Sequence, residues 1–249
     1  MLIDAIQLAV CLTGVGWSVA RDTGQYTAFK LLTDTASRQR CYRRWALESF
    51  LLLSGATLLC LTILGRLRAL ATLPAEFLPL HARLQAVVPK SQLSNSFLEG
   101  FGVALLVSLF VGTFGFGALM RKRKPLMIGD IQPLMPRNGA EMAHTALLSL
   151  NAGLSEEIFF RLLLPLLIVG LTQNLLLSFA AAAVIFGLVH AYQGAGGVVA
   201  TMFMGFVFTA LYLWTGNIWI AVALHAALDL FGLVVRPALM KIGEVNATA

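Results

Sequence analysis

Leu154-Ser-Glu-Glu-Ile-Phe-Phe-Arg161 places two carboxylates and a guanidinium inside a stretch that is otherwise apolar enough to cross a bilayer. A charged side chain at the centre of a membrane helix costs about 2.5–3.5 kcal/mol on insertion scales, so this cluster indicates a functional site. On a helix, Glu157 and Arg161 lie four residues apart and can form an ion pair along one face. Glu156 points away from that pair, so it is free to face other helices of a bundle.

The composition of the whole chain is that of a membrane protein. Of its 249 residues, 58% are hydrophobic and only 12% are charged. The net charge of +6 comes from basic residues that fall mostly between apolar stretches, where they set topology and contact lipid headgroups. Basic segments interleaved with aromatic residues are missing from the sequence, so no binding of nucleic acid is expected.

The apolar stretches predict an all-α fold, a polytopic transmembrane helical bundle of about seven or eight spans with a four-helix catalytic core. Residues 21–44 are polar and basic and are expected to form a loop between the first two spans. Prolines and charges interrupt residues 66–96, which are expected to lie at the interface or to form a broken helix. The three N-terminal spans are expected near residues 2–19, 45–64 and 97–120.

Residues 130–139, with Pro133, Pro136, Asn138 and Gly139, are expected to form a linker. We therefore predict an accessory N-terminal transmembrane region at residues 1–139, a functional core at residues 140–236 and a C-terminal tail at residues 237–249. The four helices of the core are expected at residues 140–170, 175–191, 197–214 and 217–235. Basic loops on one side of the membrane predict a cytoplasmic C-terminus.

Two later segments carry polar groups that can face Glu156. One apolar segment ends in His190, with Phe186 one turn earlier on the same face. The other contains His225 and Asp229, again four residues apart, so the Asp229 carboxylate can accept a hydrogen bond from the imidazole and fix its tautomer.

One carboxylate and two imidazoles in a cavity of low dielectric support two mechanisms. In the first, Glu156 takes a proton from a water that attacks a peptide carbonyl, while the imidazoles position the water and stabilise the oxyanion. In the second, Glu156, His190 and His225 bind zinc, a ligand set that some metallopeptidases use. The spacing of these residues leaves both mechanisms open.

Three motifs follow one another in the core: Glu156-Glu-Ile-Phe-Phe-Arg161, Phe186-Gly-Leu-Val-His190 and His225-Ala-Ala-Leu-Asp229. In this order, each within an apolar helix, they resemble the motifs of the CPBP family, the CAAX prenyl endopeptidases and bacteriocin-processing enzymes. The resemblance covers roughly residues 140–235 and implies a multi-helix intramembrane endopeptidase whose site lies in a membrane-embedded cavity.

The resemblance also implies a role for each residue. Glu156 matches the water-activating glutamate, and His190 matches its helper on that water. His225 matches a member of the oxyanion-stabilising pair. The last motif position is Asn in eukaryotic-like prenyl proteases and is Asp229 here; an ionised Asp would repel an oxyanion, so Asp229 is expected to orient His225. The residues expected to support the site are Glu157, Arg161 and Phe186.

The sequence therefore predicts a glutamate-dependent, CAAX-type intramembrane protease that uses no cofactor, with a zinc metalloprotease as the alternative. Its substrate would be a hydrophobic peptide or a membrane-anchored protein. The protein is expected to lie in the bacterial inner membrane and to cross it several times. A rival of another class is a non-catalytic immunity or scaffold protein that holds a peptide in the same cavity. An ion or proton carrier fits less well, because the charged residues gather in one site and no inverted repeat is present.

Overall fold

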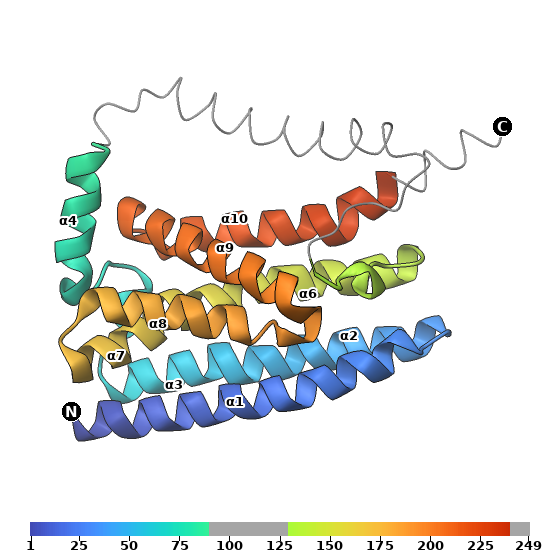
Figure 1. Cartoon of the computed structure of the whole chain (residues 1–249), viewed down its shortest axis with the longest axis horizontal. Helices are drawn as coiled ribbons and strands as arrows, with labels where there is room; N and C mark the ends of the chain where they lie inside the picture. Colours follow the sequence, from blue (N-terminus) through green and yellow to red (C-terminus); the bar gives the residue numbers. More distant parts are fainter. Residues whose placement is uncertain (90–128, 240–249) are drawn as a thin grey trace.

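The structure is a computed structural model that describes residues 1–89 and 129–239. These residues form helices and turns and no strands. Most of the helices run along the long axis of the molecule, and α4 lies across one end (Figure 1). The predicted all-α class is therefore confirmed, and the predicted span at residues 97–120 lies outside the described residues.

The N-terminal region contributes two long helical runs. The first is α1 (Leu2–Lys30), and the second continues from α2 (Thr35–Ser49) through the π-helical η1 (Phe50–Gly55) into α3 (Ala56–Ile63). The side chain of Asp34 accepts a hydrogen bond from the backbone N–H of Ser37 and caps the start of α2.

The prediction of a polar loop at residues 21–44 is wrong, because helix occupies most of that segment. Its basic side chains have partners that let the helices continue. Arg21 contacts Glu48 at 3.1 Å, and Arg38 contacts Glu141 at 3.1 Å. Charges that end a hydrophobic stretch in the sequence are thus paired between neighbouring helices in the fold.

Residues 66–89 form short pieces, as their prolines predict. These are the 3-10 turns η2 (Leu67–Leu70) and η3 (Ala75–Phe77) and the helix α4 (Leu78–Val87). The imidazole Nδ1 of His81 lies 2.6 Å from the carbonyl oxygen of Leu213, which holds α4 against the end of α9 (Gly194–Thr215). The prediction of a broken helix is confirmed for this part of the chain.

The C-terminal half forms the predicted helical core. A continuous run passes through α6 (Gly139–Glu157), the π-helical η6 (Ile158–Leu163) and α7 (Leu164–Thr172). The 3-10 turn η5 (Gln132–Leu134) precedes this run. The elements that follow it are α8 (Leu175–Leu188), the 3-10 turn η7 (Ala191–Gln193), α9 (Gly194–Thr215), α10 (Ile218–Leu230) and the π-helical η8 (Phe231–Val235). The asparagines that cap the starts of α6, α8 and α10 are Asn138, Asn174 and Asn217.

Close contact between α6 and α10 brings the first and third motifs together. A Cβ atom at Gly153 would lie only 2.6 Å from the backbone nitrogen of Ala226, so glycine is required at this crossing. Four helical runs among the described residues are long and apolar enough to cross a membrane: Leu2–Lys30, Thr35–Ile63, Ala191–Thr215 and Ile218–Leu239. The run at residues 139–172 is also long, but it carries the charged cluster in its middle.

Candidate active site

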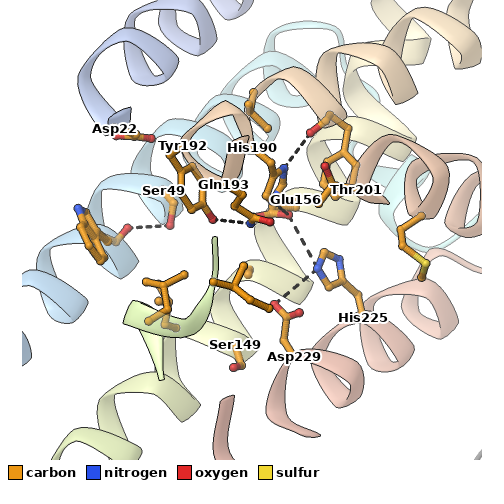
Figure 2. Close-up of a pocket in the computed structure, with 18 of the residues that line it drawn as sticks. Asp22, Ser49, Ser149, Glu156, His190, Tyr192, Gln193, Thr201, His225 and Asp229 are labelled. Atoms are coloured by element: carbon orange, nitrogen blue, oxygen red, sulfur yellow. Dashed lines mark hydrogen bonds and ion pairs between the residues drawn. The ribbon is translucent and has the colours of Figure 1, made fainter. Parts of the chain in front are cut away.

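A cavity of about 540 Å³ opens between the N-terminal helices and the core. Its walls are mostly apolar, and its polar lining includes Glu156, His190, His225 and Asp229. The structure thus brings all four predicted catalytic residues to one cavity. Figure 2 shows the side chains of Glu156, His190 and His225 turned toward one another, with Asp229 beside His225.

Glu156 faces the cavity from the last turn of α6. Its Oε2 atom lies 4.0 Å from Nε2 of His190 and 3.8 Å from Nε2 of His225. This oxygen is buried and has no hydrogen-bond partner among the described residues. Since buried carboxylate oxygens are normally hydrogen-bonded, its natural partner is a water or a substrate group in the cavity.

His190 lies just beyond the end of α8. This helix ends at Leu188, about one turn before the end of the helix predicted at residues 175–191. Its Nδ1 is 2.8 Å from the carbonyl oxygen of Phe186, which can only accept a hydrogen bond, so Nδ1 carries the proton and donates. In the neutral ring Nε2 is then an acceptor, and it faces Glu156. The Phe186 ring packs edge-on against the imidazole, with ring centroids 4.9 Å apart.

His225 is held by Glu157. Its Nδ1 lies 2.7 Å from Oε1 of Glu157, and its ring stacks on Phe208 with centroids 4.9 Å apart. The Oδ2 atom of Asp229 is 3.7 Å from Nε2 of the same ring, beyond hydrogen-bond distance. The hydrogen bond that holds the ring in this structure is the one to Glu157, and orientation of the imidazole by Asp229 stays a prediction. The close crossing of α6 and α10 places the carboxylate of Glu157 on α6 nearer to the His225 ring than the carboxylate of Asp229, which is on the same helix as His225.

Glu157 and Arg161 form the predicted ion pair, with Nε of Arg161 3.2 Å from Oε2 of Glu157. Both side chains are buried, and the guanidinium lies 4.0 Å from the centroid of the Phe186 ring. The pair therefore belongs to a buried chain of contacts, Arg161–Glu157–His225. Phe186 supports both ends of the site, since it packs on His190 and on Arg161.

The N-terminal helices supply cavity residues that no motif marks. Ser18, Asp22 and Tyr26 are four residues apart on α1 and line the cavity together with Trp45 and Ser49 from α2. Their spacing on one helix face is the only signal in the sequence that could have indicated them. Residues 1–63 therefore form part of the site and do not merely accompany it.

In this structure the carboxylate oxygen of the zinc alternative lies farther from the two imidazoles than the donors of a tetrahedral zinc site lie from one another. Tetrahedral zinc with bonds of about 2.0–2.1 Å places neighbouring donor atoms roughly 3.3–3.4 Å apart. The Glu156 oxygen lies 4.0 and 3.8 Å from the two imidazole nitrogens. Among residues 1–89 and 129–239, no group of three His, Cys, Asp or Glu side chains has the arrangement of a metal site.

The described residues form a helical bundle with apolar spans, and a carboxylate and two imidazoles meet in its cavity, an arrangement compatible with an intramembrane hydrolase. Residues 138–231 match the family model of type II CAAX prenyl endopeptidase Rce1-like, a match that contains all three motifs. The resemblance of this part of the chain to the CAAX protease family is therefore confirmed by the family model. No curated protein and no solved structure matches the chain. The family and the apolar helices together make the protein an integral membrane protein and support a CAAX-type protease activity.

Proposed function

We infer that this protein is a glutamate-dependent intramembrane endopeptidase of the bacterial inner membrane. It hydrolyses a peptide bond in a hydrophobic, lipidated or membrane-anchored peptide. The observation that carries this proposal is the convergence of Glu156 Oε2 with Nε2 of His190 and of His225, at 4.0 and 3.8 Å, inside a cavity with apolar walls.

Glu156 and His190 supply the two acceptors that an attacking water needs. A water between Glu156 Oε2 and His190 Nε2 donates one hydrogen to each, which leaves a lone pair of its oxygen directed at the substrate carbonyl carbon. The 4.0 Å between the two acceptors allows hydrogen bonds of ordinary length to both. As the water attacks, its proton passes to Glu156, which then gives it to the amine of the leaving peptide.

His225 supplies the donor for the oxyanion. Its Nδ1 donates to Glu157, so its Nε2 carries a proton only when the ring is an imidazolium. In that form the Nε2–H group faces the cavity and donates to the tetrahedral intermediate, while Glu157 balances the positive charge from behind. Asp229, 3.7 Å from Nε2, lies at the edge of this arrangement and attracts the same cation.

The cavity walls suit an apolar peptide. Aromatic and aliphatic side chains from α1, α6, η6, α8 and α9 line it next to the carboxylate, including Val15, Leu148, Phe160, Phe186 and Phe208. Walls of this kind favour an apolar peptide over a polar one. The mechanism uses no metal and no other cofactor.

The test compares the full-length protein with the Glu156→Gln variant in liposomes, using a mixture of synthetic hydrophobic peptides and mass spectrometry of the products. The variant keeps the shape of the side chain and removes the base, so cleavage is expected to fall about 10²–10⁴-fold while thermal unfolding is unchanged. Cleavage by the variant at the wild-type rate would overturn the proposal. Peptide binding by both proteins with cleavage by neither would favour the immunity or scaffold function instead.

A further inference from the structure

The hydroxyl groups that line the cavity differ in whether the protein already uses their protons. Five of them donate to backbone carbonyl oxygens of the protein: Ser18, Tyr26, Ser49, Ser149 and Thr201. Tyr192 is the exception in the described part of the chain, because its oxygen accepts a hydrogen bond of 3.0 Å from Nε2 of Gln193 and no protein group accepts its proton. The Tyr192 hydroxyl therefore has a hydrogen to give to a ligand in the cavity.

The packing of the Tyr192 ring holds this hydroxyl in place. Tyr192 lies in η7, two residues after His190, and the centroids of the two rings are 5.9 Å apart. The ring also meets that of Tyr26 on α1 edge-on, with centroids 5.1 Å apart. The backbone of η7 is fixed as well, since the carbonyl oxygen of Gln193 accepts a hydrogen bond of 2.8 Å from the N–H of Asp130. A donor held in this way loses little side-chain freedom when it binds a ligand.

Tyr192 and His225 lie on opposite sides of Glu156 in the cavity (Figure 2). In the proposed reaction, His225 donates to the oxygen of the carbonyl under attack. Successive carbonyl groups of an extended chain point to opposite sides, so the carbonyl next to the attacked one points away from His225 and toward the side of Tyr192. The cavity walls are mostly apolar, and a substrate carbonyl left without a donor in such surroundings is costly.

We propose that the Tyr192 hydroxyl donates a hydrogen bond to a backbone carbonyl of the substrate, in the peptide group next to the one that water attacks. This bond positions the peptide across Glu156, and Gln193 directs the phenol proton to the substrate by donating to the phenol oxygen. The role rests on the proposed endopeptidase function and deepens it, because it defines the substrate as an extended segment. A helical segment does not fit, since its carbonyl oxygens already accept hydrogen bonds from its own backbone.

The experiment removes each partner of this hydrogen bond in turn. The peptide that the wild type cleaves best is synthesised unchanged and in two forms, with the peptide group before or after the cleaved bond replaced by a trans-alkene, which removes a carbonyl and keeps the extended shape. Cleavage is measured in liposomes with the full-length wild type and with Tyr192→Phe, which keeps the ring. Binding is measured on Glu156→Gln with and without Tyr192→Phe, by fluorescence anisotropy of a dye on the peptide. Should no peptide be cleaved, the alkene is moved along the best-bound peptide one peptide group at a time.

For the unchanged peptide, Tyr192→Phe is expected to weaken binding and to lower kcat/KM about 10–100-fold, because a buried carbonyl loses its donor. The hydrogen bond forms before the reaction, so the change should lie mainly in KM. One of the two alkene peptides should be bound and cleaved equally by both proteins, since it has no carbonyl for the hydroxyl to hold. Tyr212→Phe is the matched control: Tyr212 is a buried tyrosine of α9 outside the cavity lining that the described residues form, and its loss should change neither binding nor cleavage.

The alkene peptides distinguish substrate binding from a structural role of Tyr192. A loss in Tyr192→Phe that is equal for all three peptides would assign the hydroxyl to the stability of the site and overturn its role in binding, and so would unchanged binding of the unmodified peptide. Neither result affects the endopeptidase function, which the Glu156→Gln variant tests by itself. Binding that needs both the hydroxyl and one particular carbonyl, without cleavage by the wild type, would uphold the role of Tyr192 and refute the proposed function.

Discussion

The buried chain Arg161–Glu157–His225 predicts that Glu157→Gln damages both stability and catalysis. Glu157 is fully buried, and it is the only carboxylate within 4 Å of the Arg161 guanidinium among the described residues. Removing one partner of a buried ion pair typically costs about 3–5 kcal/mol, because the other charge is left unpaired. His225 also loses the charge that holds its Nδ1 proton, so cleavage is expected to fall roughly 10²–10⁴-fold, as when the carboxylate of a catalytic triad is replaced by an amide.

A second substitution separates the two effects. Replacing a buried ion pair by uncharged residues is often neutral for stability, so Glu157→Gln combined with Arg161→Met should regain most of the lost stability. Cleavage should remain low in the double variant, because His225 still lacks its carboxylate partner. Glu141→Gln serves as the control: it removes the buried partner of Arg38 at the other end of α6, and it should lower stability without changing kcat.

The assay pairs thermal unfolding in detergent with cleavage of one peptide by equal amounts of folded protein. The reasoning is refuted if Glu157→Gln cleaves as fast as the wild type, or if the double variant recovers cleavage together with stability. Either outcome would mean that the 2.7 Å contact between Glu157 and His225 has no part in the reaction.

Three further predictions concern the crossing of α6 and α10, the ion pair of Arg66 with Glu76, and the need for a metal. Gly153→Ala should lower the free energy of unfolding by about 1–3 kcal/mol, because the added methyl group would press on the backbone of Ala226; an unchanged unfolding midpoint would contradict the close α6–α10 crossing. The Arg66 guanidinium, hydrogen-bonded to Glu76 at 2.7 and 2.6 Å, holds the pKa of the Glu76 carboxyl below its ordinary value of 4.5. The stability gained from that pair is present above about pH 4.5 and lost as pH falls through the lower folded-state pKa, so the difference in Tm between wild type and Glu76→Gln should vanish in acid; a difference that persists there would refute it. Activity should survive stringent chelation with the metal content measured on the same sample, and loss that stoichiometric zinc restores would establish the metalloprotease alternative through Glu156.

The parts of the site that local spacing governs could be read from the sequence. Glu157 and Arg161 are four residues apart on one helix, and their ion pair forms as that spacing requires. Glu156 is the next residue around the helix, about 100° away, so it faces the cavity when Glu157 does not. The orientation of His225 could not be predicted, because a partner four residues away on the same helix and a partner on a crossing helix satisfy the same imidazole equally well.

The N-terminal region shows the other limit. A prediction from hydropathy ends a span at the first charged residues, so it places a loop where α1 and α2 continue as helices. The pairing of Arg38 with Glu141, about one hundred residues apart in the sequence, arises only in the packed bundle. For the same reason, the four-residue spacing of Asp22 and Tyr26 does not by itself show that they line the cavity.

The sequence by itself determined that this chain is a helical membrane protein, where the helices of its core lie, and that three short motifs mark its candidate site, because hydrophobicity and helical spacing act over a few turns. Only the tertiary structure decided which carboxylate holds His225 and which N-terminal side chains line the cavity. Those facts depend on how separate helices cross, and a crossing such as that of Gly153 with Ala226 is set by the packing of the whole bundle.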